Sequence, residues 1–299
     1  MSNPTESPDV AQIEINGVNI CVEDHGSSES AILFLHFSGA NLRMWDRMIP
    51  LMHERHRCIA LDLRAHGRSS APGAGYHPAD FAADILGVLD ALEIEKTHVV
   101  GSSLGAEVGL SLAASNADRV LSLVADGALC SEYGAYGTRA ASSLDEDESM
   151  LERLQVIRDC AETSYGSTDD LVDATRAMYE GSLYWSDCLE TVTAYGTVQA
   201  SEGSFVTAWR KWARDEYMEH YFRLQVEEHW PHVRCPILML PDEEFRTDEK
   251  AFAIVNRLAE LPTTCEIRVV PGSDHPFSWM QIPEAMAEAV LGFLGQVDG

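Results

Sequence analysis

The feature that most constrains the fold is residues 97–105, where an apolar, β-branched stretch ends abruptly in small residues. Beyond it, Leu104, Val108 and Leu112 recur at the spacing of one helix face. The run therefore predicts a strand, a tight turn and a helix. Within the turn, Ser103 lies between two glycines in the pattern Gly-x-Ser-x-Gly.

Ser103 is the candidate nucleophile of this turn. A sharp strand-to-helix turn forces its central residue into a strained backbone, and flanking glycines remove side chains that would collide there. The hydroxyl then points out of the sheet edge, beside a helix N-terminus that favours developing negative charge. Ser102 also carries a hydroxyl, but it does not lie between the two glycines.

Continuous apolar runs recur on both sides of this motif, and such runs are typical of strands buried on both faces. Besides the strand before Ser103, they predict strands at residues 31–35, 58–61, 120–124, 237–240 and 267–270. Helical patterns separate many of the runs, which indicates an α/β fold with a doubly wound, mostly parallel sheet. Near the N-terminus, Asn16 and Gly17 between two alternating stretches predict a β-hairpin at the sheet edge.

Residues 127–233 break this alternation. They contain helical patterns and no convincing strand pattern, which predicts an all-helical cap inserted after the sixth core strand. Residues 1–126 and 234–299 would then form the core. The cap is rich in aromatic residues, which either line an apolar pocket or form the core of the cap itself: Tyr184, Trp185, Trp209, Trp212, Tyr217, Tyr221, Phe222 and Trp230.

Charge and cysteine usage exclude several classes of protein. The formal net charge is −27, which repels nucleic acids and anionic membranes, so neither is expected as a partner. The seven cysteines are scattered and form no C-x-x-C pair, which argues against disulfides and a zinc site and for reduced thiols in the cytoplasm. Residues 1–8 lack the regions of a signal peptide, and no apolar run reaches membrane-spanning length.

A serine hydroxyl becomes a useful nucleophile when a base takes its proton and a third group orients that base. His275 follows the last predicted strand, and three carboxyl groups follow strands before it: Asp126, Asp242 and Glu244. Ligands of doubly wound sheets bind outside the carboxyl ends of the strands. We therefore expect His275 and one of these acids to meet Ser103 at that edge.

Together these motifs resemble the α/β-hydrolase superfamily, whose triad order is Ser, then Asp or Glu, then His. The matching pieces are the loop after Leu35-His36, Asp-x-Arg-x-His-Gly-x-Ser at residues 62–69, the serine turn, and Gly-x-x-His ending at His275. Register against the family pattern puts Glu244 at the acid position, with Asp242 as a nearby alternative. Asp126 is the other alternative, because some relatives place the acid after the preceding strand.

The resemblance also implies an oxyanion hole made by the backbone N–H groups of Ser38 and Leu104. Phe37 departs from the family, which usually has glycine after the histidine of this loop. The polar residues Asp62, Arg64 and His66 are interpreted as groups that pin a loop by hydrogen bonds and salt bridges.

The predicted function is a serine hydrolase that cleaves a small to medium carboxylic ester or lactone through an acyl-enzyme on Ser103. Its substrate would be a small apolar or aromatic molecule, and no metal or organic cofactor is expected. A carbon–carbon bond hydrolase of a diketone uses the same triad and stays an alternative. A cofactor-independent oxygenase and a non-catalytic ligand receptor are further alternatives, because fold alone does not fix function. Haloalkane dehalogenation is disfavoured, because in this superfamily it uses an aspartate nucleophile.

Overall fold

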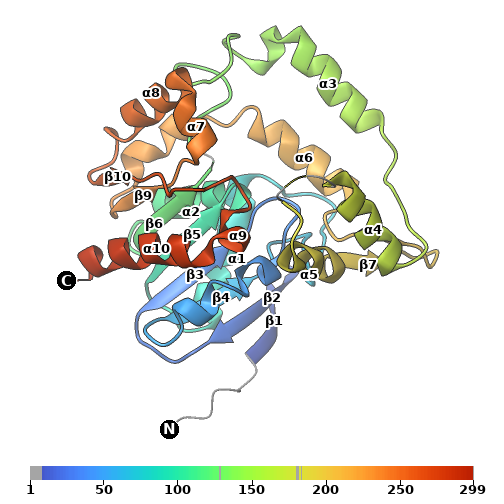
Figure 1. Cartoon of the computed structure of the whole chain (residues 1–299), viewed down its shortest axis with the longest axis horizontal. Helices are drawn as coiled ribbons and strands as arrows, with labels where there is room; N and C mark the ends of the chain where they lie inside the picture. The colour runs from blue at the N-terminus through green and yellow to red at the C-terminus, as the bar shows by residue number, and fades with distance from the viewer. Residues whose placement is uncertain (1–8, 128, 180–181, 183, 299) are drawn as a thin grey trace.

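The computed structural model describes residues 9–127, 129–179, 182 and 184–298. Residues 1–8, for which the sequence predicts no signal peptide, lie outside the described residues. An eight-stranded sheet forms the centre of the molecule, in the order β1-β2-β4-β3-β5-β6-β9-β10 (Figure 1). Its strands are β1 Asp9–Ile15, β2 Val18–His25, β3 Ala31–Leu35, β4 Arg57–Leu61, β5 Thr97–Ser102, β6 Val120–Asp126, β9 Ile237–Met239 and β10 Cys265–Ile267.

The sheet is antiparallel at one edge and parallel elsewhere. β1 pairs with β2, and β2 with β4, in antiparallel register, whereas the remaining neighbours are parallel. The predicted hairpin is confirmed, because Asn16 and Gly17 join β1 to β2 with φ angles of 53° and 79°. Two successive positive φ angles match the right-handed twist of the flanking strands. The predicted α/β class is therefore confirmed.

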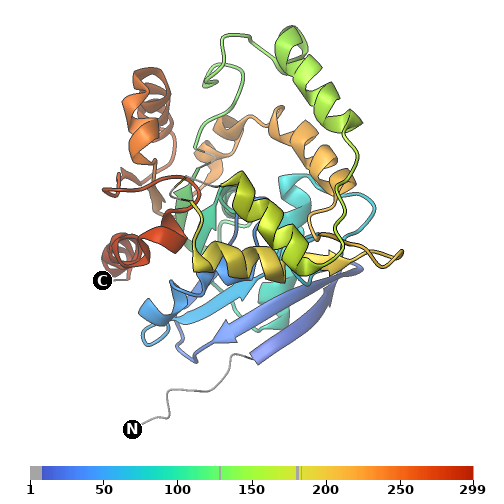
Figure 2. The same cartoon turned by 45° about the vertical axis from the view of Figure 1, so that its right-hand side comes forward.

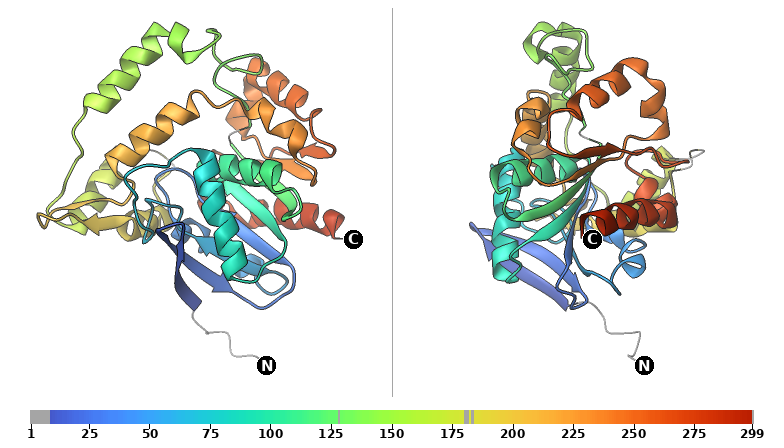
Figure 3. Two further views of the ribbon diagram at one scale, coloured as in Figure 1. Left: turned by 180° about the vertical axis from the view of Figure 1, so that it is seen from behind. Right: turned by 90° about the vertical axis from the view of Figure 1, so that its left-hand side faces the viewer.

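Helices cover both faces of the sheet, which explains the continuous apolar runs. In β3, Leu33 packs into one hydrophobic cluster and Phe34 into the other. The first cluster lies under α1 Pro78–Ala91, α2 Leu104–Ser115 and α8 Glu249–Leu258, and the second under α9 Ser278–Gln281 and α10 Pro283–Val297. Figure 3 shows α10 and the α1–α2 pair on opposite sides of the strands.

The segment between β6 and β9, which the sequence predicts to be an all-helical cap, is not all helical. Its helices are η3 Leu144–Glu146, α3 Glu148–Asp159, α4 Thr168–Met178, α5 Asp187–Tyr195, α6 Lys211–Tyr221, η4 Val226–Glu228 and η5 Trp230–His232. A two-stranded sheet interrupts them, formed by β7 Thr197–Gln199 and β8 Phe205–Thr207. Each strand has three residues, which is too short for an alternating pattern to be visible. Figure 2 shows α3 farther from the central sheet than α4 and α5.

The last core strand begins and ends earlier than predicted. β10 covers Cys265–Ile267, whereas the apolar run predicted residues 267–270. The Arg268 N–H still donates to the Met239 carbonyl at 2.9 Å, but the chain then turns, and Pro271 has no N–H with which to extend a ladder. The core also contains the short helices η1 Leu42–Trp45, η2 Ile49–Leu51 and α7 Glu243–Thr247.

All seven cysteines are free thiols. Among the helices of the described residues, none combines the length and apolarity required to cross a bilayer.

Candidate active site

Ser103 lies in the turn between β5 and α2, as the sequence predicts. Its backbone has φ 51° and ψ −117°, a conformation that residues other than glycine adopt rarely. A Cβ on Gly101 would collide with the Gly105 carbonyl, and a Cβ on Gly105 would collide with the Leu35 carbonyl. Both glycines of the motif are therefore required by close backbone approach, and the tight turn leaves the Ser103 side chain partly exposed.

The carboxylate of Asp126 binds the imidazole of His275. Asp126 is the last residue of β6, and its Oδ1 lies 2.9 Å from His275 Nδ1. The Asp126 side chain is 4% exposed and that of His275 is 28% exposed. When Nδ1–H donates to this carboxylate, Nε2 is left to accept a proton. Gly127 has φ 71°, and a Cβ there would collide with the imidazole, so only glycine leaves room for this ring.

Charge around His275 favours its protonated form. Burial alone would lower the pKa of His275, but the charge of Asp126 and its hydrogen bond raise that pKa above its ordinary value. Asp242 and Asp274 add smaller contributions of the same sign. The backbone of Ser103 joins the same group, because its N–H donates to the Asp126 carbonyl at 2.6 Å. The structure thus brings Ser103, Asp126 and His275 together at one edge of the sheet.

Glu244, the acid expected from register, does not hold this histidine. It lies in the first turn of α7 and is exposed. The expectation is corrected to Asp126, the alternative after the preceding strand. The carboxylate of Asp242 binds backbone N–H groups instead of the imidazole. It caps α7 by accepting from Phe245 N–H at 2.5 Å, and it accepts from His275 N–H at 3.1 Å.

The loop after β3 carries Ser38, and hydrogen bonds fix the residues on either side of it. The Phe37 carbonyl accepts from Ala40 N–H at 3.0 Å and lies 2.8 Å from His36 Nδ1. Gly39 N–H donates to His66 Nε2 at 3.0 Å. Leu104 is the first residue of α2, where backbone N–H groups have no partner within the helix. Ser38 and Leu104 therefore stay the proposed oxyanion donors.

Burial keeps the two histidines that brace this loop neutral. It lowers the pKa of His36 to about 4 and that of His66 well below its ordinary value. Neutral rings provide acceptors, since Leu63 N–H donates to His36 Nε2 at 3.0 Å. The His66 ring stacks on Trp209 of the cap, with 4.1 Å between ring centroids. The interpretation of His66 as a group that pins a loop is confirmed.

Asp62 and Arg64 fix the next loop in the same way. The Asp62 carboxylate accepts from Leu42 N–H at 2.8 Å and from Arg68 N–H at 2.7 Å. Burial raises its pKa to about 6. Arg64 forms a two-pronged ion pair with Asp84, with both distances 2.7 Å. These polar groups are structural supports of the loops around Ser38.

Comparison with known proteins agrees with this fold. A family model for the alpha/beta hydrolase fold matches residues 30–155. The crystal structure of E-2-(acetamidomethylene)succinate hydrolase superposes with a TM-score of 0.77 at 23% identity, covering 97% of this chain and all of that one. The chain has the α/β-hydrolase fold.

Two curated relatives match parts of this chain. An epoxide hydrolase of Caballeronia sordidicola is 30% identical over 219 residues, 70% of this chain and 63% of that protein. A 2-hydroxymuconate semialdehyde hydrolase of Pseudomonas sp. strain CF600 is 33% identical over 129 residues, 42% of this chain and 45% of that protein. The chain thus spans less than two thirds of the length of either relative.

A cavity of 210 Å³ lies between the core and the cap, and Ser38 is one of the residues that line it. Phe37 and Phe277 contribute to its wall from the core, and Leu171, Val192 and Trp209 from the cap. The cavity is smaller than most pockets for drug-sized ligands, which measure roughly 300–1,000 Å³. Its lining is mostly apolar, with a few hydroxyl groups from threonines and Ser38.

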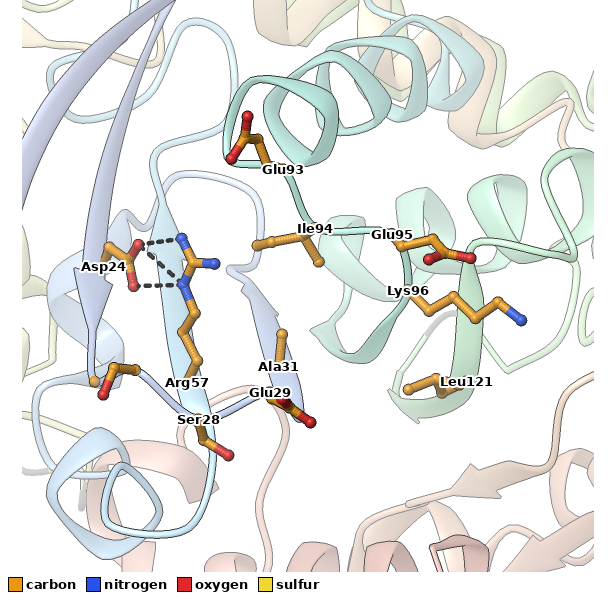
Figure 4. A pocket seen from close by; sticks show the side chains of 12 residues that line it. Asp24, Ser28, Glu29, Ala31, Arg57, Glu93, Ile94, Glu95, Lys96 and Leu121 are labelled. Atoms are coloured by element: carbon orange, nitrogen blue, oxygen red, sulfur yellow. Dashed lines mark hydrogen bonds and ion pairs between the residues drawn. The ribbon is translucent and has the colours of Figure 1, made fainter.

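A larger hollow of 820 Å³ lies at the other end of the parallel strands, where they begin (Figure 4). It adjoins the starts of β3 and β4 at Ala31 and Arg57, and Arg57 pairs there with Asp24 at 2.6 Å. Because α/β sheets bind ligands outside the carboxyl ends of their strands, the smaller cavity beside Ser38 is the candidate substrate site.

The sequence reasoning missed two residues that complete this site. Ser102 Oγ donates to Asp126 Oδ2 at 2.9 Å, and Trp279 Nε1 donates to the same oxygen at 2.6 Å. Their only signal in the sequence is their position: Ser102 precedes Ser103, the candidate nucleophile, and Trp279 lies four residues after His275. For Asp126 the signal is the glycine that follows it, Gly127, because a side chain at that position would collide with the His275 ring.

Proposed function

We propose that this protein is a serine hydrolase that cleaves small carboxylic esters or lactones through an acyl-enzyme on Ser103. The observation that carries the proposal is the joint geometry of the strained Ser103 turn and the Asp126–His275 pair. A strained serine beside a helix N-terminus, with an oriented imidazole nearby, is the arrangement that acyl transfer requires.

In this mechanism His275 Nε2 accepts the Ser103 proton as Oγ attacks the substrate carbonyl carbon. Asp126 holds the imidazole by Nδ1 and stabilises the imidazolium that forms. The N–H groups of Ser38 and Leu104 donate to the oxyanion of the tetrahedral intermediate. His275 then protonates the leaving alcohol and afterwards activates the water that cleaves the acyl-enzyme.

The serine favours carbonyl substrates over saturated ones. Attack of Ser103 on a carbonyl gives an ester, which an activated water molecule cleaves by the same addition. Attack on a saturated carbon would give an ether, which such a water molecule does not cleave. The 210 Å³ cavity and its apolar lining further support a small apolar group on the acyl or alcohol side.

The test combines a fluorophosphonate probe with a panel of esters of increasing chain length and a set of lactones. We expect the wild-type protein to be labelled and to prefer short substrates, because the cavity is small. Ser103→Ala should abolish both labelling and hydrolysis. Ser102→Ala is the matched control, because it removes the neighbouring hydroxyl and leaves the nucleophile in place, and it should still be labelled to completion. Full labelling of Ser103→Ala would refute the proposal.

A further inference from the structure

Both oxygens of the Asp126 carboxylate are bonded, and each faces a different set of partners. Oδ1 faces the imidazole of His275, whereas Oδ2 accepts from Ser102 Oγ at 2.9 Å and Trp279 Nε1 at 2.6 Å. Ser102 and Trp279 are both 0% exposed, and Asp126 is 3% exposed. Water therefore has little access to Oδ2, and these two donors take its place.

The two donors come from the segments that carry the other members of the candidate triad. Ser102 ends β5, lies opposite Asp126 in the register of the sheet, and is followed directly by Ser103. Trp279 lies in α9, four residues after His275. The carboxylate is thus bonded on one side to the nucleophile strand and on the other to the histidine segment.

We propose that Ser102 and Trp279 are positioning residues that fix the rotation of the Asp126 carboxylate and draw its charge toward Oδ2. A carboxylate with unbonded oxygens rotates and offers its imidazole partner changing geometries. With Oδ2 held by two donors, Oδ1 has one orientation toward Nδ1. Charge-assisted hydrogen bonds of this kind are stronger than neutral ones, and they fix geometry. This inference rests on the proposed function for its effect on turnover.

The two donors should also moderate the basicity of the histidine. The groups that face His275 are Asp126 from β6, Asp242 from the loop before α7, and Asp274 from its own loop. Removing one donor from Oδ2 leaves more negative charge on Oδ1, which stabilises the imidazolium. The pKa of His275 then rises, and the protonated, inactive form persists to higher pH.

The experiment compares Trp279→Phe and Ser102→Ala with two buried controls. Trp45→Phe makes the same change of ring beside Trp279, 5.1 Å away between centroids, and the Trp45 indole N–H has no hydrogen-bond partner among the described residues. Ser122→Ala removes a buried hydroxyl that bonds His98 instead. For each variant, kcat and KM are measured against pH on the best ester, with a thermal melt as the check on folding.

We expect kcat to fall about tenfold in Trp279→Phe and in Ser102→Ala, the scale of one lost hydrogen bond to a charged group. KM should change little, and the acid limb of kcat should move to higher pH by roughly half a unit. The controls should leave the acid limb in place. An acid limb that is unchanged, or that moves to lower pH, in both donor variants would overturn the proposal.

A second readout needs no turnover. The imidazole of His275 is titrated by NMR in the free protein, and its midpoint should rise in both donor variants and not in Trp45→Phe. If the wild-type protein hydrolysed none of the esters or lactones, the proposed hydrolase function would fail, while this titration would still decide the role of Ser102 and Trp279. Equal midpoints in the donor variants and wild type would reject that role.

Discussion

At the scale of single residues, position on a strand decides which carboxyl group reaches His275. Asp126 ends β6, and β6 neighbours β5, so its side chain emerges beside the Ser103 turn. Glu244 follows β9 by five residues and is exposed in the first turn of α7. The same helix uses Asp242 as its N-cap. With Asp242 as the cap of α7, Glu244 falls in the exposed first turn of this helix.

Asp126→Asn should therefore abolish most turnover. Neutralising the acid of a related triad costs about 10⁴ in kcat, because the imidazole loses its orientation and its stabilised charge. The pKa of His275 is raised by Asp126, so the variant should also show an acid limb displaced to lower pH. Profiles of kcat against pH measure both effects.

Glu244→Gln and Asp242→Asn are the controls for this substitution. Glu244→Gln should retain activity within about twofold, because exposed substitutions away from a site usually have small effects. Asp242→Asn should lose more than Glu244→Gln and far less than Asp126→Asn, since its carboxylate accepts the His275 N–H. A steep loss of kcat in Glu244→Gln, together with a near-normal kcat in Asp126→Asn, would show that Glu244 and not Asp126 is the acid of the triad.

The residues that sequence alone locates are those with a local signature. Ser103 is identified by the two glycines that its turn requires, and the asparagine–glycine hairpin by its positive φ angles. The choice among Asp126, Asp242 and Glu244 depends on how a carboxyl group approaches a ring from another segment. That approach is set by strand register, which no short pattern encodes. Trp279 has no pattern at all, because its partner is 153 positions away.

At the scale of elements, strands whose residues are all apolar and buried are predictable, as β3 and β9 show, and short, partly exposed strands are not. β3 coincides with its predicted run, because five apolar residues buried on both faces leave a clear signal. β7, β8 and β10 have three residues each and are shaped by their partners. The cap therefore looks all helical in the sequence, although a small hairpin interrupts it.

The contact between α2 and the cap contains a buried carboxyl group. Glu107 of α2 is 2% exposed, and its two oxygens lie 3.0 and 3.1 Å from the hydroxyl of Tyr217 on α6. Burial raises the pKa of Glu107 to about 8. The folded protein thus keeps this group protonated where the unfolded chain, with an ordinary value of 4.5, has lost the proton.

This difference predicts the direction of a pH effect on stability. The folded state binds the extra proton between pH 4.5 and about 8, so this contribution is fully present below that window and is lost as pH rises through it. Glu107→Gln keeps a similar shape and does not titrate. The melting temperature of Glu107→Gln relative to wild type should therefore increase steadily from about pH 5 to pH 8.

Tyr217→Phe is the matched control, because it removes the hydrogen bond and leaves the carboxyl group in place. The melting temperature of Tyr217→Phe should be lower than that of wild type. It should still decrease as pH rises, as the melting temperature of wild type does, because Glu107 is retained. Parallel curves for Glu107→Gln and wild type across this range would contradict the linkage.

At the scale of the whole molecule, negative charge exceeds positive charge by 27, from 48 acidic and 21 basic residues. Many of the basic side chains are already committed to ion pairs, such as Arg64 with Asp84 and Arg210 with Glu162. The excess carboxylates therefore repel one another across the surface. Such self-repulsion destabilises a compact state, and dissolved salt weakens it.

The hollow at the starts of β3 and β4 shows this excess locally, since Glu29, Glu93 and Glu95 all line it (Figure 4). All three are exposed. Raising sodium chloride from about 0.01 M to about 0.15 M shortens the screening length from roughly 30 Å to roughly 8 Å. We expect the melting temperature of the wild-type protein to rise over this range.

The variant Glu95→Gln tests whether this rise comes from charge repulsion. Removing one charge from the group should raise the melting temperature at low salt, and the difference from wild type should shrink as salt increases, because screening has the same effect. Ser28→Ala, in the same hollow, changes a side chain without changing charge and should leave the salt response unaltered. A Glu95→Gln difference that stays constant from low to high salt would mean that local packing, and not the net charge, sets the effect. A melting temperature of the wild-type protein that falls with salt would show that repulsion between carboxylates does not limit its stability.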